Sequence, residues 1–201
     1  MVKVTKEAAL QNHQDLLRAT GQMMRANGVS VATVANIAAE AGLTHGAIYR
    51  HFPSKDELAA AAISADFETI VALLTQIRQQ GGSLADYYRA YLAADHRDYF
   101  VWGCPVASLA AEIGRTSLPV RSAFAEGLAR NLDAIATLSG IVNPHAARSY
   151  ALSALAMLSG AMALARATRA CDPETSELVL EEALQTLLAD PRLAGQGPAK
   201  S

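Results

Sequence analysis

Apolar residues recur along the chain at the three- to four-residue spacing of helices, and no segment alternates apolar and polar side chains as a half-buried strand does. A first stripe of leucine and methionine predicts a helix from about residue 6 to residue 27. Shorter apolar sets predict helices over 33–41 and 44–51. The pattern therefore predicts an all-α fold.

Capping signals predict where the later helices begin. Ser54 and Glu57 have the spacing of a capping box, which predicts the start of a long helix reaching about Gln80. Five further starts follow capping residues, four of them with proline in the first turn, where its missing N–H costs nothing. They lie at Ser83, Cys104, Ser117, Asn143 and Asp172. The total is about nine helices, and Pro191 is predicted to close the last one.

Composition indicates a globular protein, because 51% of the 201 residues are hydrophobic and 18% are charged. The formal net charge is −2, but residues 41–55 contain no acid and include Arg50 and Lys55, which form a weak basic patch. Two cysteines and an N-terminus without an apolar segment predict a cytoplasmic protein without a disulfide framework. The uncharged run from Tyr150 to Leu164 is shorter than the ~18–20 apolar residues of a membrane span and predicts a buried helix.

Residues 33–52 have the layout of a helix-turn-helix, in which two short helices meet at a glycine-containing turn and the second enters the DNA major groove. Gly42 permits the left-handed backbone that the turn requires, and Leu43 and Ile48 are expected to face the core. The side chains expected to project outward are those of Thr44, His45, Tyr49, Arg50 and His51.

The stretch from about Asp15 to Leu58 resembles the DNA-binding domain of the TetR family of bacterial repressors. The matching residues are Gly28, Thr33, Ile37, Ala38, Ala41 to Thr44, Ile48, Tyr49, His51, Phe52 and Ser54 to Leu58. The resemblance implies a DNA-binding domain over 1–57 and an effector-binding and dimerisation domain over 58–201. The chain departs from the family in its N-terminal arm, where only Lys3 and Lys6 are available to meet DNA.

The resemblance also implies roles for individual residues. His45, Gly46 and Ala47 would touch or approach base edges, whereas Tyr49 and His51 would contact the phosphate backbone. Thr33, Thr44, Arg50 and Lys55 complete the candidate DNA-binding set, and Lys55 would meet a phosphate at the start of its helix. Simpler readings remain open: a half-buried core Tyr49, an Arg50 paired with an acid and a solvated Lys55.

A cluster of aromatic residues between positions 87 and 102 could line a small-molecule pocket or form plain core. The pocket candidates are Tyr87, Tyr91, Tyr99, Phe100, Trp102, Cys104 and Met157. If Cys104 caps a helix, the helix N-terminus would lower its thiol pKa and make it reactive. The alternative is that Cys104 is a small buried packing residue.

The last two predicted helices carry more apolar surface than one domain can easily cover, which favours a two-fold dimer over a monomer with a hydrophobic hairpin. The interface candidates are Leu155, Leu158, Met162, Leu180, Leu184 and Leu187.

The sequence as a whole predicts a ligand-responsive dimeric repressor that binds a palindromic double-stranded DNA operator and is released by a small molecule of unknown identity. The alternative is a small-molecule-binding protein whose helix-turn-helix has lost DNA binding. No nucleotide-binding or hydrolase motif indicates an enzyme. The acid and histidine cluster over 95–98 reads as a solvated helix end, so no metal and no cofactor are expected.

Overall fold

The computed structural model describes residues 6–99 and 103–193, together with the side chains from residue 10 onward, and within these ranges it consists of helices without a strand. The ten α-helices are α1 (Lys6–Asn27), α2 (Val34–Glu40), α3 (His45–His51), α4 (Lys55–Gln79), α5 (Leu84–Tyr91), α6 (Ala94–Asp98), α7 (Pro105–Ile113), α8 (Leu118–Leu138), α9 (Pro144–Thr168) and α10 (Pro173–Leu188). The predicted all-α fold is confirmed.

The predicted helix starts agree with the structure, and two details differ. The helix absent from the prediction is α6, a single turn whose N-cap, Ala93, makes no side-chain capping bond and so leaves no signal in the sequence. Pro191 does not close α10, which ends at Leu188. Instead it begins a short 3₁₀ turn, Pro191–Leu193.

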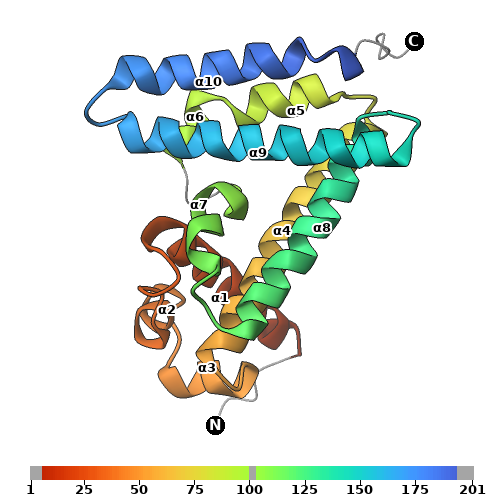
Figure 1. Ribbon diagram of the computed structural model, residues 1–201. Coiled ribbons are helices and arrows are strands. Elements are labelled where there is room, and N and C mark those ends of the chain that lie inside the picture. Colours follow the sequence, from red (N-terminus) through yellow and green to blue (C-terminus); the bar gives the residue numbers. More distant parts are fainter. Residues whose placement is uncertain (1–5, 100–102, 194–201) are drawn as a thin grey trace.

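The helices form two groups at opposite ends of the molecule. Figure 1 shows α1–α3 at one end, with α5, α6, α9 and α10 stacked at the other. The long helices α4 and α8 run side by side between the two ends, and α7 lies next to them. The end that carries α3 is therefore far from α10, and the long helices α4 and α8 connect the two ends.

Two hydrophobic clusters match these two ends, and α4, α7 and α8 contribute to both. The first cluster joins α1–α3 to Leu58 through Phe67 of α4 and includes Leu109 of α7 and Phe124 of α8. The second joins α5, α9 and α10 and includes Leu74 and Cys104. The predicted domain boundary between residues 57 and 58 falls inside the first cluster, and it stays a prediction.

α4 and α8 approach each other most closely where the clusters meet. Gly127 of α8 faces the ring of Phe67, and a Cβ atom added to Gly127 would overlap that ring. Phe67 is fully buried and also packs edge-on against Phe124, with ring centroids 5.4 Å apart. Only glycine allows this approach, because every other side chain would push the two helices apart.

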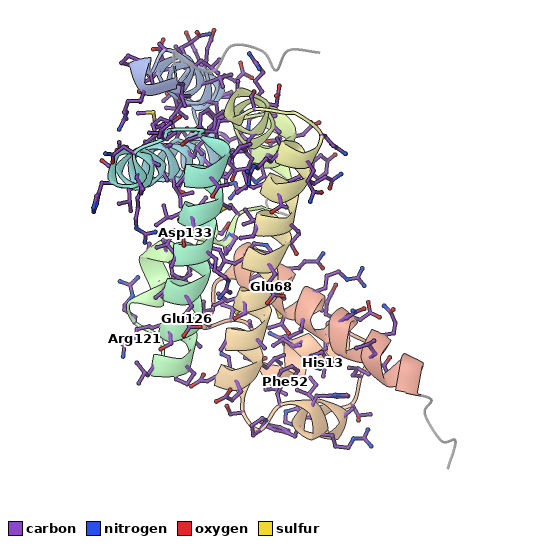
Figure 2. All side chains as sticks on the ribbon, turned by 90° about the vertical axis from the view of Figure 1, so that its right-hand side faces the viewer. His13, Phe52, Glu68, Arg121, Glu126 and Asp133 are labelled. Atoms are coloured by element: carbon purple, nitrogen blue, oxygen red, sulfur yellow. The ribbon has the colours of Figure 1, made fainter. Side chains whose placement is uncertain are left out.

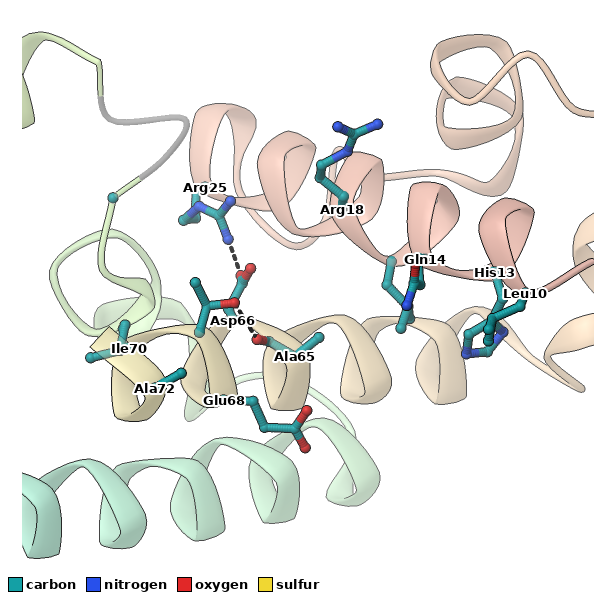
Figure 3. Close-up of a pocket in the computed structure, with 13 residues that line it drawn as sticks. Leu10, His13, Gln14, Arg18, Arg25, Ala65, Asp66, Glu68, Ile70 and Ala72 are labelled. Carbon is teal, nitrogen blue, oxygen red and sulfur yellow. Dashed lines mark hydrogen bonds and ion pairs between the residues drawn. The ribbon is translucent and has the colours of Figure 1, made fainter. Parts of the chain in front are cut away.

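Two polar contacts hold the end of α1 against the helices behind it. Arg25 of α1 pairs with Asp66 of α4, and both side chains are largely buried (Figure 3). The Glu112 carboxylate of α7 accepts the backbone N–H of Val29 at 3.0 Å and packs against Gly28, whose φ of +88° favours glycine. α1 and the loop that follows it are thus tied to both α4 and α7.

By length and composition alone, α4 and α9 are apolar enough to cross a membrane, which core helices of water-soluble proteins often are as well. α9 packs against α10, α8 and α7, and its residues Tyr150, Leu158 and Met162 are fully buried. One face of the predicted buried helix is therefore in the core, while much of its apolar stretch is exposed in a single chain.

Candidate nucleic-acid interface and ligand cavity

Two threonine caps and one glycine build the turn between α2 and α3. The Thr33 hydroxyl accepts the N–H of Asn36 at 3.2 Å at the start of α2. The Thr44 hydroxyl accepts the N–H of Ala47 at 3.3 Å at the start of α3. Between them Gly42 has a φ of +64°, the left-handed conformation expected from the sequence. Thr33 and Thr44 therefore have structural roles in addition to their predicted contacts with DNA.

The outer face of α3 is open and carries small, aromatic and basic side chains. His45 and Tyr49 lie on it with their rings edge to face at 5.2 Å, and Tyr49 is 47% exposed, so it is not a core residue. A Cβ atom added to Gly46 would meet nothing within 4 Å. Arg50 is exposed and makes no ion pair with any side chain that the structure describes.

Ala47 differs from the other residues predicted to approach base edges. Its side chain is only 8% exposed, because it shares with Ile48 the face of α3 that packs inward. The structure therefore places His45 and Gly46, but not the methyl group of Ala47, on the open face.

His13 of α1 supports the end of α3, a contact that sequence reasoning missed. Its ring stacks on Phe52 at 5.1 Å and lies 5.8 Å from the ring of His51 (Figure 2). His51 is exposed, so it presents a ring to solvent while α1 supports it from behind. No local motif marks His13, because the contact depends on how α1 crosses α3.

Lys55 begins α4 directly after the Ser54 cap, whose hydroxyl accepts the Glu57 N–H at 3.1 Å. The Lys55 ammonium donates to the carbonyl of Ser30 at 3.3 Å and is half-buried. An ammonium has three N–H donors, so this bond leaves two for a phosphate. Lys55 is therefore partly held by the protein and still has donors free for a phosphate.

A cavity of about 240 Å³ lies at the other end of the molecule, among α4, α5, α6 and the start of α7. It is lined by Ile70, Leu73, Ile77, Tyr87, Ala90, Tyr91, His96, Gly103 and Cys104. A larger groove of about 680 Å³ lies between α1 and α4, but charged side chains from both helices line it, including the Arg25–Asp66 pair (Figure 3). The smaller cavity has the apolar lining typical of a small-molecule site.

Every titratable group of the cavity wall is held in its uncharged form. Burial raises the pKa values of Tyr87 and Tyr91 well above their usual range and also raises the pKa of the Cys104 thiol. Burial lowers the pKa of His96. Its Nδ1 lies 2.5 Å from the Tyr91 carbonyl, so in the neutral ring Nδ1 carries the proton and donates, and Nε2 is left as an acceptor.

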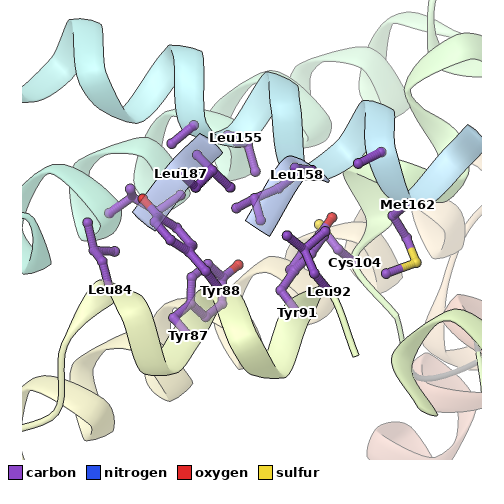
Figure 4. Packing of buried hydrophobic residues seen from close by; sticks show 14 of the residues in the cluster. Leu84, Tyr87, Tyr88, Tyr91, Leu92, Cys104, Leu155, Leu158, Met162 and Leu187 are labelled. Carbon is purple, nitrogen blue, oxygen red and sulfur yellow. The ribbon is translucent and has the colours of Figure 1, made fainter. Parts of the chain in front are cut away.

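Cys104 is the N-cap of α7, as predicted, but its thiol is not activated. The side chain makes no capping bond and is 4% exposed, within the second cluster (Figure 4). The N–H groups of Val106 and Ala107 favour the thiolate, whereas desolvation opposes it more strongly and raises the pKa. The structure favours the packing reading of Cys104.

Two buried tyrosines near the cavity differ in how their hydroxyls are satisfied. Tyr88 shares a 2.5 Å hydrogen bond with Tyr150. The Tyr91 hydroxyl is fully buried beside the Cys104 thiol and the Ser159 hydroxyl, both of which influence its pKa, although burial is the main reason why that pKa is raised. Figure 4 shows the Tyr91 hydroxyl directed toward Cys104.

Family comparisons cover both ends of the molecule. The sequence model described as "Bacterial regulatory proteins, tetR family" matches residues 16–62. A second, described as "Transcriptional regulator LmrA/YxaF-like, C-terminal domain", matches residues 82–173. The chain belongs to the TetR family.

Curated relatives of this TetR-family chain match mainly its N-terminal part. The HTH-type transcriptional regulator TtgR of Pseudomonas putida is 41% identical over 69 residues, which are 34% of this chain and 33% of that protein. The probable acrEF/envCD operon repressor of Escherichia coli (strain K12) is 41% identical over 58 residues, 29% of this chain and 26% of that protein. The chain thus matches about a third or less of each relative's length.

Solved structures extend the likeness to nearly the whole TetR-family chain. The reduced form of E. coli NemR has a TM-score of 0.75 at 21% identity and covers 88% of this chain and 95% of that one. A TetR-family regulator from Agrobacterium tumefaciens has a TM-score of 0.71 at 21% identity, with coverages of 89% and 98%. At this identity the likeness supports the fold.

The pocket candidates do not all reach the cavity. Tyr87, Tyr91 and Cys104 line it. Tyr99 is 68% exposed and Met157 lies on the outer surface of α9, so neither lines the cavity in this TetR-family structure. Phe100 and Trp102 lie outside the described residues. The interpretation of 95–98 as a solvated helix end is wrong for His96 and Arg97. Arg97 is buried, and His96 lines the cavity because α6, which has no sequence signal, turns it toward Tyr91.

Most of the proposed interface leucines turn inward rather than outward. Leu155, Leu158, Met162, Leu180 and Leu187 are at most 6% exposed within one chain, and Leu184 is partly buried against the same cluster. They hold α9 and α10 together, because α10 packs on α9 along its length. The first five are therefore not on a surface that a second chain could reach.

A different face of α9 is open and uncharged. No charged residue occurs between Arg148 and Arg166. Its exposed residues include Ser149, Leu152, Ala156, Met157, Gly160, Ala163 and Leu164. A Cβ atom at Gly160 would meet nothing within 4 Å, so this face is unobstructed at that point.

Proposed function

We propose that this protein is a ligand-responsive transcriptional repressor that binds a palindromic double-stranded DNA operator as a homodimer. The observation that carries the proposal is the open face of α3, with Gly46 unobstructed between His45 and Tyr49. The names of the relatives support it, since one is a transcriptional regulator and another an operon repressor. We infer a cytoplasmic, non-enzymatic protein on the same grounds.

In the proposed complex α3 enters the major groove. Gly46 lets the backbone approach the bases, and His45 and Arg50 supply donors that can read base edges. Tyr49, His51 and Lys55 contact phosphates, which set the register of the helix in the groove. The modest charge of this end implies that affinity depends on fit as well as on counterion release.

The proposed dimer forms through the exposed face of α9 rather than through the leucines predicted from sequence. Leu152, Met157 and Leu164 would pack beside the small residues Ala156 and Gly160 of the same helix. An exposed apolar patch rimmed by charges is typical of a protein interface. Two copies paired in this way would present two copies of α3, which must lie about 34–36 Å apart to enter successive major grooves.

Two helices connect the cavity with the DNA-facing end. α4 lines the cavity with Ile70 and Leu73 and carries Lys55 at its other end. α7 begins at Cys104 in the cavity wall and holds the Val29 N–H through Glu112. An effector that prefers one position of these helices would change the separation of the two copies of α3, provided that it binds the two states with different affinity.

The test replaces Gly46 with alanine. Because the new methyl group meets no atom of the protein, the Gly46→Ala protein should fold and gain up to about 1 kcal/mol from helix propensity. The same methyl group should obstruct DNA and weaken operator binding at least tenfold, measured by fluorescence anisotropy on duplexes selected from a random library. The matched control is Gly114→Ala, which also meets nothing within 4 Å but lies at the end of α7.

Each outcome decides between the two functions considered. Loss of binding in Gly46→Ala with retention in Gly114→Ala supports the repressor. If the wild-type protein selects no DNA at any salt concentration, the alternative of a small-molecule-binding protein with a degenerate helix-turn-helix replaces it. If Gly46→Ala binds as tightly as wild type, α3 does not approach DNA in the proposed way.

A further inference from the structure

We propose that His13 and His51 together bind one DNA phosphate when their imidazoles are protonated, so that the protein takes up protons as it binds DNA. This inference rests on the proposed function, since it adds His13 to the DNA contacts and makes those contacts dependent on pH. Its basis is the position of two neighbouring rings at the edge of α3 and the scarcity of fixed positive charge around them.

The two rings come from different helices and lie next to each other. The ring centroids of His13 in α1 and His51 in α3 are 5.8 Å apart, and the His13 ring stacks on Phe52 at 5.1 Å (Figure 2). Phe52 is buried, whereas His13 is half-buried and His51 is exposed. A protonated imidazole has two N–H donors, so two such rings at this spacing can each donate to an oxygen of one phosphate group.

Neither ring is paired with a carboxylate among the side chains that the structure describes. Four charged residues line the groove between α1 and α4 together with His13, namely Arg18, Arg25, Asp66 and Glu68. Asp66 is held by Arg25, and the charged neighbour of His51 on α3 is Arg50, a cation. A proton gained by the pair is therefore not neutralised by an ion pair within the described chain.

Proton binding at the pair is coupled to DNA binding. Two protonated imidazoles this close repel each other, which in the free protein opposes the protonation of both rings at once. A phosphate beside both rings offsets the repulsion, so the complex holds more protons than the free protein. Because the two equilibria are linked, affinity for DNA must rise as the pH falls. Free histidine has a pKa of about 6.5, which places this effect near neutral pH.

The segment that builds the DNA-facing end has few fixed positive charges. Over residues 33–57 two bases face three acids, so the net charge is −1 when histidine is neutral. The bases are Arg50 and Lys55, and the acids are Glu40, Asp56 and Glu57. Protonation of His45 and His51 would change this charge to +1, and His13 would add a further charge beside them. Histidine can therefore supply much of the positive charge that a polyanion requires.

Fluorescence anisotropy on the full-length protein tests the proposal, with a duplex selected from a random library at about pH 7. Dissociation constants are compared at about pH 8 and about pH 6.5 at one ionic strength, because salt alone changes affinity for DNA. Each proton taken up raises the affinity by at most about tenfold per pH unit. For the wild-type protein we expect an affinity about tenfold higher at the lower pH.

Two substitutions at position 13 separate the charge of the ring from its packing. His13→Phe keeps a ring that can stack on Phe52 but cannot bind a proton, so it should reduce the tenfold gain to about threefold or less. His13→Arg carries a fixed charge on a group that can also stack on Phe52. It should raise the affinity at about pH 8 several-fold and flatten the pH dependence.

His145→Gln is the matched control, because it removes an exposed histidine at the start of α9, at the other end of the molecule from α3 (Figure 1). This variant should keep the full gain in affinity at the lower pH. Circular dichroism at both pH values checks that each variant is folded.

Three results would overturn the proposal: a wild-type affinity that does not change with pH, a His13→Phe protein that keeps the whole gain, or an equal loss of the gain in His145→Gln. In each of them the operator is still bound, so the repressor stands and only the phosphate site is wrong. If the wild-type protein selects no DNA at either pH, the proposed function fails and the phosphate site fails with it.

Discussion

Replacing Gly127 with alanine should destabilise the protein even though alanine is the better helix former. In an exposed helix the change would gain roughly 1 kcal/mol. Here the new methyl group would overlap the ring of Phe67, which is fully buried and cannot turn away because Phe124 packs against it. Forcing extra volume into such a core costs typically about 1–3 kcal/mol, and the steep overlap places this site at the upper end of that range. We expect a net loss of about 2 kcal/mol.

Urea denaturation at one fixed protein concentration measures the loss, because the stability of a dimer depends on concentration. Gly114→Ala, whose methyl group meets nothing within 4 Å, is the matched control and should be neutral or up to about 1 kcal/mol more stable.

A smaller side chain at position 67 separates the packing explanation from a backbone effect. Phe67→Leu alone should destabilise the protein by about 1 kcal/mol, but in the presence of Gly127→Ala it should cost less, since it relieves the overlap. A coupling energy near zero between the two changes, or a Gly127→Ala protein as stable as wild type, would refute the close approach of α4 and α8 at this point.

Three further predictions concern other parts of the molecule. In the folded protein iodoacetamide should modify the exposed Cys171 much faster than the buried Cys104, followed by mass spectrometry, and equal rates would contradict the burial of Cys104. Glu112→Ala should destabilise the protein by about 1 kcal/mol in urea because the Val29 N–H loses its acceptor, and Glu112→Gln, which keeps one, should recover part of it. Because burial lowers the pKa of His96 below the unfolded value of about 6.5, its contribution to stability is complete above that pH and is lost as the pH falls. His96→Gln should therefore flatten the acid side of the stability profile, and an unchanged profile would show that His96 is not the group that titrates.

Local signals in the sequence predicted most of the fold. Caps such as Thr33, Thr44 and Ser54 bond to N–H groups within three residues of their own position. The helix starts that they predict therefore do not depend on the tertiary packing. α6 was missed because one turn without a capping bond is held by what packs on it, including the bonds from Arg166.

The candidate sites were harder to predict because they depend on which face of a helix meets which neighbour. Periodicity marked Leu155 and Leu158 as apolar but could not say whether they pack on α10 or on a second chain. The proximity of Cys104 to a helix N-terminus was visible in the sequence, whereas the burial that outweighs it was not. The residues of the α3 face were found because the turn chemistry itself fixes which side of α3 is open.

The uninterrupted length of α4 has a geometric consequence. Its 25 residues include no glycine and no proline, which are common sites of sharp kinks, and α8 runs beside it, so we expect α4 to move as one unit. At 1.5 Å per residue the helix is about 37 Å long, and a rotation of about 5° about its cavity end moves its other end by roughly 3 Å. In a two-fold pair the displacements are related by the symmetry axis, so the separation of the two ends changes by up to about twice that amount. In the proposed repressor, a small shift of α4 at its cavity end would therefore become a change of several ångströms in the spacing of the two DNA-facing ends.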